Sequence, residues 1–467
     1  MSKANIPNIA TKQLKLQDCK AGKKIVISTN WLPLFGFEKD TKVVEELIGV
    51  GQGIKIRLAK RSDKRIKKVY SREYKGRKNN PFETLMDIRR QDLLEKAIPS
   101  DTEKVHVTFK YGVLTIVPIT NKRARAIEKF KHSKNRLGTF LACSSGVDGF
   151  SLEKKGFTIE TLLEYRPNEK RDKNDLSETG ALNALANISP KYLINEDIMN
   201  LDLEKIAELT CKSETSLFHI SLQCDDFSNV KAKSLKDNSI IDTSSSLDMA
   251  YDMLRMVEKF SFPAILIENV RGFSQSDIGK MTQVRLQRLG YKVHNMIFDA
   301  REFGGKTSRV RNYMFATLLP AEFSLPTYEK KQECSLWEEF IESKILNNEL
   351  REVSHSKSIQ DGISTGRARV ITRSSLSSPT FLKSQDRMAK DSVVIFDEIR
   401  GKIFFPSNEL ASQLMGISQQ FDFSLVSKSI ESEIIGQSIE VPLHEAILDS
   451  IKEHINSSYS QLHGKLF

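Results

Sequence analysis

Seven short apolar runs, separated by helix-like segments, constrain the fold of this chain more than any other feature of its sequence. Helical patterns lie between the runs, most clearly at Ser245–Lys259 and Lys280–Leu289. Strands that alternate with helices form a mostly parallel sheet with helices on both faces, so the sequence predicts an α/β fold. The seven predicted strands are Leu137–Cys143, Phe157–Tyr165, Lys191–Ile198, Leu217–Gln223, Ala264–Glu268, Tyr291–Phe298 and Asn312–Leu318.

The cysteines and the apolar content bear on the compartment and on metals. Five cysteines are scattered over 467 residues, with no CxxC pair and no Cys/His cluster. This pattern is typical of reduced thiols in a cytoplasm and argues against a structural zinc site. No apolar stretch is long enough to cross a bilayer, and Met1–Lys15 lacks the apolar core of a signal peptide. We therefore expect a cytoplasmic protein that binds no metal and no membrane.

The first 135 residues differ from the rest and are predicted to form a basic, β-rich N-terminal domain. Basic residues dominate Lys55–Lys78 and recur at Lys122–Lys134, in a chain with a net charge of +11. Such clusters favour a polyanionic partner, although a solvated surface or a flexible linker has the same composition. Between them, Val105–Ile119 alternates and breaks at Tyr111-Gly112, which predicts a β-hairpin. The segment Asn30–Phe37 resembles the swapped-hairpin DNA-binding domains of the AbrB class, which implies DNA binding and homodimerisation.

The alternating rhythm stops after Leu319. Residues 321–402 are rich in Ser, Thr, Lys and Arg, a composition that predicts an irregular segment or a small separate lobe. Helix-like patterns return at Asn408–Met415 and Leu443–His454. The expected division is an N-terminal domain (1–135), an α/β domain (136–320), a lobe (321–402) and a return to the α/β domain (403–467).

Residues able to do chemistry follow the ends of two predicted strands. Cys224 comes directly after one strand and Glu268-Asn269 ends another, while Arg309 and Arg311 flank Val310 farther along the chain. Ligands of open α/β sheets bind beyond the carboxyl ends of the strands, so these side chains are candidates for one site. A lone cysteine at such a position is also compatible with a buried, inert thiol.

In order and spacing, the motifs from Gly138 to Ile451 resemble the DNA (cytosine-5) methyltransferases. That family folds as a class I S-adenosyl-L-methionine-dependent methyltransferase, with a Rossmann-like seven-stranded sheet and a target recognition lobe. The resemblance implies a cofactor site at the loop Phe140–Gly149, at acids that end the next two strands and at a C-terminal segment. The cofactor-binding residues implied are Phe140, Ser145, Gly146, Glu164, Tyr165, Asp197, Ile198, Gln437 and Ser438.

The same resemblance implies four catalytic residues. Cys224 matches the nucleophile that adds to C6 of cytosine, although it lies in Gln-Cys-Asp where the family usually has Pro-Cys-Gln. An acid beside a thiol raises the thiol pKa, which would slow this step. Glu268 matches the acid that shares a proton with cytosine N3. Arg311 would hold cytosine O2, and Arg309 would lie beside the nucleophile and the backbone.

The function implied is transfer of a methyl group from S-adenosyl-L-methionine to C5 of a flipped-out cytosine in double-stranded DNA. Such an enzyme would be cytoplasmic and nucleoid-associated, in a prokaryotic or phage-like setting, and part of DNA methylation or restriction-modification. Residues 321–402 fall where the family carries its target recognition domain. Two alternatives remain open: an RNA (tRNA) cytosine-C5 methyltransferase, and a DNA-binding regulator whose methyltransferase domain has decayed.

Overall fold

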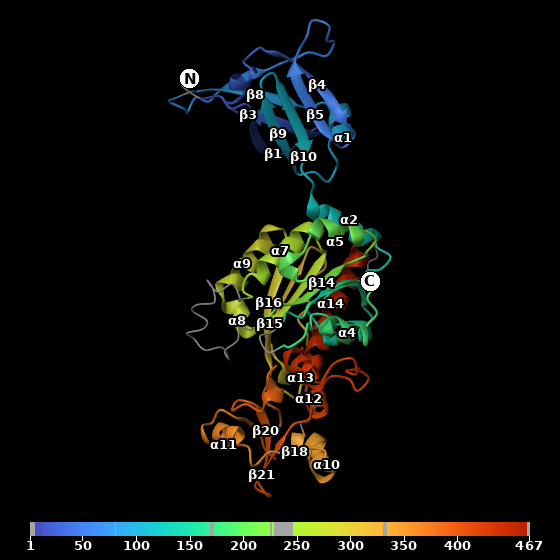
Figure 1. The fold of residues 1–467 in the computed structure, drawn as a ribbon. Helices are drawn as coiled ribbons and strands as arrows, with labels where there is room; N and C mark the ends of the chain where they lie inside the picture. Colours follow the sequence, from blue (N-terminus) through green and yellow to red (C-terminus); the bar gives the residue numbers. More distant parts are fainter. Residues whose placement is uncertain are drawn as a thin grey trace. The chain divides into compact units, whose positions relative to one another are not determined.

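The computed structural model describes residues 5–79, 81–168, 172–224, 227, 246–329 and 334–464. The chain divides into two compact units, Met1–Arg125 and Ala126–Phe467, which we call the N-terminal and C-terminal units (Figure 1). The division falls within helix α2 (Lys122–His132), earlier than the expected boundary at residue 135. In the part of the chain that the structure describes, no helix has the length and apolar character needed to cross a membrane.

In the described residues of the N-terminal unit, ten short strands form two sheets. The predicted hairpin is present: Lys110 pairs with Val113 across Tyr111-Gly112, and Gly112 adopts a positive φ of 72°. Asn30–Phe37, which resembles a swapped-hairpin domain, contains a 3-10 helix (η1, Leu32–Phe35). One sheet has the order β1 (Ala10–Lys15), β9 (Lys104–Lys110), β10 (Val113–Pro118), β5 (Gly53–Leu58), β4 (Lys42–Gly49) and β6 (Lys67–Lys68). The other has the order β2 (Gln17–Cys19), β3 (Gly22–Ser28), β8 (Phe82–Ile88) and β7 (Tyr70–Glu73), and helix α1 (Gln91–Ala97) follows β8.

All seven strands predicted from the apolar runs occur in one sheet of the C-terminal unit. Its order is β13 (Tyr192–Ile194), β12 (Thr158–Leu163), β11 (Gly138–Ala142), β14 (Leu217–Ser221), β15 (Ala264–Val270), β17 (Val310–Thr317) and β16 (Lys292–Asp299). β17 runs antiparallel to both of its neighbours, and the other pairings are parallel. This mixed α/β sheet confirms the methyltransferase-like fold expected for this part of the chain.

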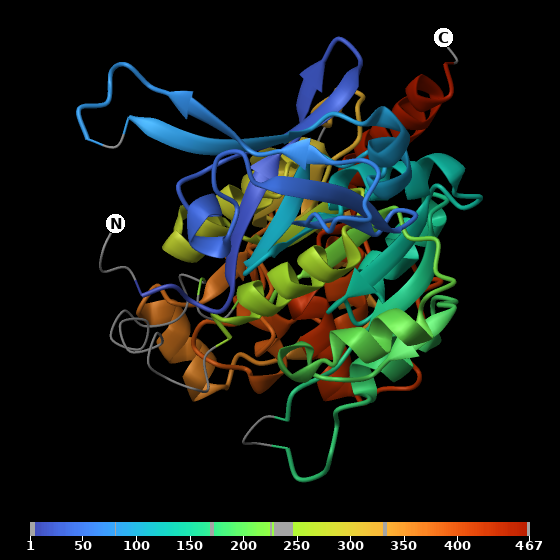
Figure 2. The same cartoon turned by 90° about the horizontal axis from the view of Figure 1, so that it is seen from above.

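Helices cover both faces of this sheet, because successive side chains of each strand point to opposite faces (Figures 1 and 2). Phe140 and Ala142 face one core, whereas Leu141 between them faces the other. The first face packs against α5 (Leu203–Leu209), α7 (Met249–Phe260), α8 (Arg271–Gln275) and α9 (Asp277–Arg288). The second packs against α3 (Val147–Lys154), α4 (Thr179–Leu185) and α14 (Val441–Leu462). Two 3-10 helices, η2 (Ile198–Asn200) and η3 (Ala300–Phe303), follow strands β13 and β16.

The segment expected to be irregular contains a small four-stranded sheet. Its order is β18 (Arg351–Glu352), β21 (Lys402–Phe405), β20 (Val393–Asp397) and β19 (Arg369–Ile371), with helices η4 (Trp337–Ile341), α10 (Glu342–Leu346), α11 (Lys357–Ser364) and η5 (Gln385–Arg387) around it. Because β21 pairs with β20, this lobe extends to Phe405 and not to residue 402. Helices α12 (Asn408–Leu414) and α13 (Lys428–Gln437) share a hydrophobic core with the lobe. Each begins at a serine, Ser407 or Ser427, whose hydroxyl accepts a backbone N–H of the first turn.

Candidate active site at the carboxyl ends of the strands

Glu268 of β15 and Arg311 of β17 form an ion pair between these two neighbouring strands. Arg311 Nε lies 3.0 Å from Glu268 Oε1, and both residues are less than a tenth exposed. Burial raises the pKa of Glu268 above its ordinary value, although the positive charges of Arg311 and Arg309 oppose that shift. A buried carboxyl group that keeps its proton more readily than usual is suited to act as an acid.

Arg309 is 1 % exposed and connects this site to segments that lie far away in the sequence. Its guanidinium donates to the carbonyls of Gly436 and Gln437, each at 3.2 Å, and to that of Phe381 at 3.5 Å. Burial and the charge of Arg311 lower the pKa of Arg309 to about 9, and the charges of Glu268 and Cys224 act in the opposite direction. Arg309 therefore connects the central sheet to the lobe and to the end of α13 by hydrogen bonds. It also interacts electrostatically with Cys224.

Cys224 lies three residues beyond β14 and is half-buried. The last residue of β14, Ser221, is in register with Glu268 on the adjacent strand. The side-chain amide of Asn269 donates to Leu222 O at 3.2 Å and fixes the start of the segment that carries the thiol. The sheet thus brings Cys224, Glu268, Arg309 and Arg311 to one edge. Asp225, whose carboxylate was expected to raise the thiol pKa, lies outside the described residues.

A sharp turn between β11 and α3 forms the neighbouring part of this edge. Cys143, Ser145 and Gly146 all adopt positive φ angles, of 59°, 49° and 101°. A Cβ atom added at Gly146 would come within 2.8 Å of the Cα of Ala184, so glycine is required there. The amides of Ser144 and Ser145 donate to Glu164 Oε2 at 2.7 and 3.0 Å. The turn is therefore folded around the carboxylate that ends the next strand.

The acids at the ends of β12 and β13 lie beside this turn. Burial raises the pKa of Glu164, and the hydrogen bonds from the two serine amides oppose that effect. Asp197 begins η2 and accepts from Met199 N at 3.0 Å, and its charge and that of Glu164 both act on the thiol of Cys143. Tyr165 is half-buried next to Glu164, whereas the side chain of Ile198 lies in the core.

Three other residues predicted to contact a cofactor have different surroundings. Phe140 is 2 % exposed and packs against Phe218, Phe260 and Phe262. The alternation of the strand turns the ring of this predicted cofactor-binding residue into the core. The side chain of Gln437 is exposed at the end of α13, and the hydroxyl of Ser438 donates to Ile435 O at 2.9 Å.

A polar cluster that the sequence pattern did not predict lies under this edge of the sheet. Asp148, His219, Ser221, Tyr313 and His444 come from four different elements and meet on the face covered by α3 and α14. The available signal was the presence of His219 inside an otherwise apolar strand. Among the described residues, no group of three His, Cys, Asp or Glu side chains is arranged to hold a metal ion.

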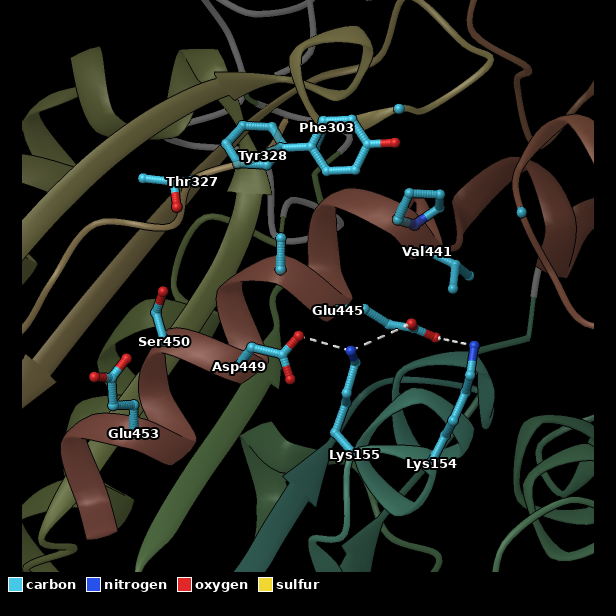
Figure 3. Close-up of a pocket in the computed structure, with 14 residues that line it drawn as sticks. Lys154, Lys155, Phe303, Thr327, Tyr328, Val441, Glu445, Asp449, Ser450 and Glu453 are labelled. Carbon is cyan, nitrogen blue, oxygen red and sulfur yellow. Dashed lines mark hydrogen bonds and ion pairs between the residues drawn. The ribbon is translucent and has the colours of Figure 1, made fainter. Parts of the chain in front are cut away.

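A separate cavity of about 520 Å³ lies along the outer side of α14 (Figure 3). Phe303 and Tyr328 form part of its wall, and none of the predicted site residues lines it. Its lysines are paired with acids of α14: Lys154 with Glu445 and Lys155 with Asp449, each at 2.7 Å. Each of these two lysines is therefore neutralised by an acid of α14. The cavity is distinct from the strand-end site.

Comparison with known proteins identifies the relatives of this chain. Residues 143–453 match the family model for C-5 cytosine-specific DNA methylases. The type II methyltransferase M.MspI of Moraxella sp. is 36 % identical over 73 residues, which are 15 % of this chain and 18 % of that protein. The chain therefore spans less than a fifth of the length of this curated relative.

Solved structures with low sequence identity also match about two thirds of the chain. The Dnmt2 methyltransferase of S. pombe is 16 % identical, with a TM-score of 0.46, and the match covers 67 % of this chain and 97 % of that one. The methyltransferase EhMeth of Entamoeba histolytica is 18 % identical, with a TM-score of 0.49, over 68 % and 98 % of the two chains. A prophage-encoded DNA modification methyltransferase (E. coli) is 16 % identical, with a TM-score of 0.46, over 68 % and 99 %. Since the family model spans more than half of the sequence and includes Cys224, Glu268, Arg309 and Arg311, this chain belongs to the C-5 cytosine-specific DNA methylase family.

Proposed function

We propose that this chain transfers a methyl group from S-adenosyl-L-methionine to C5 of a cytosine in duplex DNA, through a covalent bond between Cys224 and C6. The observation that carries the proposal is the grouping of Cys224, the Glu268–Arg311 pair and Arg309 at one edge of the sheet. Family membership supports the same chemistry. The grouping gives each step of that chemistry a residue suited to it.

The turn between β11 and α3 and the two acids beside it fit the proposed cofactor. Glu164 Oε1 accepts a long hydrogen bond, of 3.4 Å, from Ser145 Oγ. This oxygen can therefore still accept hydrogen bonds from ribose hydroxyls. Asp197, at the end of the next strand, would accept from the adenine amino group, and Tyr165 would lie against the base. When bound, S-adenosyl-L-methionine supplies the methyl group as an electrophile. The chain supplies orientation and hydrogen-bond acceptors.

The four catalytic residues divide the chemistry of the base among them. The thiolate of Cys224 adds to C6, and Glu268 gives its proton to N3 as negative charge develops on the ring. Arg311 would hold O2, in keeping with its contact to Glu268. After C5 is methylated, the proton on C5 leaves to solvent, the S–C6 bond breaks, and N3 returns its proton to Glu268. The raised pKa of Glu268 favours the protonated form that begins this cycle.

Duplex DNA is the proposed substrate because two parts of the chain lie outside the methyltransferase sheet. The lobe between β17 and α12 would read the target sequence, and the basic N-terminal unit would add phosphate contacts. A cytosine inside a duplex cannot reach Cys224, so the base must be flipped out of the stack. N-terminal homodimerisation remains a prediction.

Covalent trapping tests the proposal directly. Purified protein is incubated with S-adenosyl-L-methionine and a mixed-sequence duplex containing 5-fluorocytosine, and the products are separated under denaturing conditions. Fluorine blocks the final elimination, so we expect a stable adduct with the wild-type chain. Cys224→Ser should form no adduct and lose turnover, while its cofactor binding by calorimetry stays within about twofold of wild type.

The same assay with tRNA containing 5-fluorocytosine decides the substrate class. An adduct with tRNA and none with duplex DNA would assign the activity to RNA. No adduct with either, together with no heat of cofactor binding, would reject the enzyme in favour of a DNA-binding regulator. Normal methylation by Cys224→Ser would reject the assignment of the nucleophile.

A further inference from the structure

A buried polar cluster lies directly beneath Glu268, on the sheet face that α3 and α14 cover. Ser221 and Tyr313 are the register partners of Glu268 on the two adjacent strands, so all three side chains point to the same face. Asp148 (2 % exposed) reaches this face from α3, and His219 (fully buried) lies two residues before Ser221. The cluster therefore contains a carboxyl group and an imidazole next to the proposed proton donor.

Asp148 and His219 share one proton. His219 Nδ1 lies 3.1 Å from the carbonyl oxygen of Leu266, which can only accept, so Nδ1 carries a hydrogen. His219 Nε2 lies 3.2 Å from Asp148 Oδ2, and that hydrogen bond needs a second proton between the two atoms. Ser221 Oγ donates to the same oxygen of Asp148 at 2.8 Å, which favours the carboxylate and leaves the proton on the ring. The pair therefore places a negative and a positive charge side by side.

The other members of the cluster are neutral. The ring of His444 stacks on that of His219, with centroids 5.0 Å apart, and burial together with the charge of His219 lowers the pKa of His444 to about 3. Tyr313 lies 5.9 Å from His444 between ring centroids, and burial raises its pKa well above the ordinary value. Within the described residues, neither nitrogen of His444 nor the hydroxyl of Tyr313 has a hydrogen-bond partner. The ionisable charge in the cluster thus resides on Asp148 and His219.

We propose that Asp148 and His219 are positioning residues that set the charge next to Glu268, and thereby the pH range in which Glu268 holds the proton it gives to cytosine. The catalytic consequence rests on the proposed function of Glu268, whereas the electrostatic coupling does not. Asp148 acts to keep Glu268 protonated, and His219 limits that effect by neutralising Asp148.

The charges that face Glu268 give the sign of each effect. Burial raises the pKa of Glu268, Arg311 and Arg309 lower it, Asp148 raises it and His219 lowers it. Since an acid loses its proton as pH rises, a higher pKa extends the protonated form to higher pH. Among the described residues, the groups whose charges act on Glu268 are Arg309, Arg311, Asp148 and His219. Tyr313 is affected by the charge of Glu268, and Cys224, Glu440 and His444 interact electrostatically with members of this set or with Tyr313.

Two substitutions separate the two charges. Asp148→Asn removes the negative charge, while its amide oxygen can still accept hydrogen bonds from His219 and Ser221. His219→Gln removes the positive charge while its amide can still donate to Asp148. Infrared titration of the full chain, without DNA or cofactor, follows the protonated carboxyl band of Glu268, which is assigned by its absence in Glu268→Gln. We expect Asp148→Asn to move the loss of this band to lower pH by about one unit, and His219→Gln to move it to higher pH by a similar amount.

Thr317→Val is the matched control, because it also removes a buried polar contact from the sheet, that of Thr317 Oγ1 with His454 at 3.0 Å. It should leave the titration unchanged. Shifts of Asp148→Asn and His219→Gln in the same direction, or no shift in either, would overturn the proposal. The same opposite shifts should appear in the high-pH limb of the methylation rate. Opposite infrared shifts in a chain that methylates nothing would leave the coupling standing and reject the proposed function instead.

Both substitutions are buried, so a third measurement covers failure to fold. In wild-type protein with 15N-labelled histidine, the proton shared by His219 and Asp148 should give a far-downfield NMR signal that couples to a ring nitrogen. Glu268→Gln, which leaves the pair intact, should change the chemical shift of this signal. A signal that does not respond to Glu268→Gln would also overturn the proposal.

Discussion

Glu440 provides the most quantitative prediction, because its carboxyl group is almost fully buried at the start of α14. It is 1 % exposed, and its Oε2 accepts from Leu443 N at 3.3 Å. Burial raises its pKa from the ordinary 4.5 to about 8, even though the hydrogen bond from Leu443 and the charge of Arg309 oppose the shift. The folded chain therefore keeps a proton on Glu440 at neutral pH that the unfolded chain has lost.

The sign and size of the effect follow from linkage. The folded state binds more protons than the unfolded state between pH 4.5 and about 8, so stability is highest below this interval and falls as pH rises through it. At pH 7 this shift costs about 3 kcal/mol, and between pH 5 and pH 9 the cost grows by about 4 kcal/mol. Glu440→Gln removes this cost. We expect the variant to be more stable than wild type at pH 9, and its free energy of unfolding relative to wild type to be lower at pH 5 than at pH 9.

Urea unfolding at pH 5, 7 and 9 measures the difference. The chain has two tryptophans, Trp31 in the N-terminal unit and Trp337 in the C-terminal unit, so both proteins should carry Trp31→Phe to make the fluorescence of Trp337 report on the unit that contains Glu440. The free energy of unfolding of the variant minus that of wild type should rise steadily with pH.

Glu453→Gln is the control, because it makes the same chemical change at an exposed position of the same helix. It should change the free energy of unfolding by less than about 0.5 kcal/mol at each pH. If the difference between Glu440→Gln and wild type were equal at pH 5 and pH 9, Glu440 would ionise normally in the folded chain and the reasoning from burial would be wrong.

Two further predictions concern the cofactor and the N-terminal unit. Glu164→Gln should weaken binding of S-adenosyl-L-methionine by about tenfold or more in calorimetry, because it replaces a charged acceptor of the ribose hydroxyls, and unchanged affinity would remove Glu164 from the site. Deleting residues 1–121, which ends before α2 begins, should weaken DNA binding and flatten its salt dependence without changing which sequence is methylated, as read by sequencing of methylated DNA. A changed target sequence would show that the N-terminal unit takes part in recognition.

The central sheet could be predicted from the sequence because helices bury its strands on both faces. Such strands consist almost entirely of apolar, β-forming residues, so β11, β14 and β15 stand out as continuous runs. The lobe sheet could not be found in this way. Its strands β18 and β19 contain two and three residues, too few for an alternating pattern to appear.

The catalytic residues could be placed at strand ends, but their supporting contacts could not. Asp148 and His444 meet His219 through three-dimensional packing, although they lie nearly 300 residues apart in the sequence. Phe140 shows the opposite problem: its position before the turn was correct, yet only the pleat of β11 decides which face its ring enters. Spacing along the chain carries no information on either point.

Helix α14 has a consequence for how the chain is made. Its residues Leu443, Ile447, Leu448 and Ile451 complete the core on one face of the central sheet, yet roughly 120 residues separate α14 from β17, the last strand of that sheet in sequence. At typical rates of synthesis, a ribosome needs on the order of ten seconds to add that many residues. During this time α3 and α4 can cover this face but α14 cannot, so part of its apolar surface remains available to chaperones or to other chains. Synthesis of the lobe thus sets the interval in which this protein is most prone to aggregate.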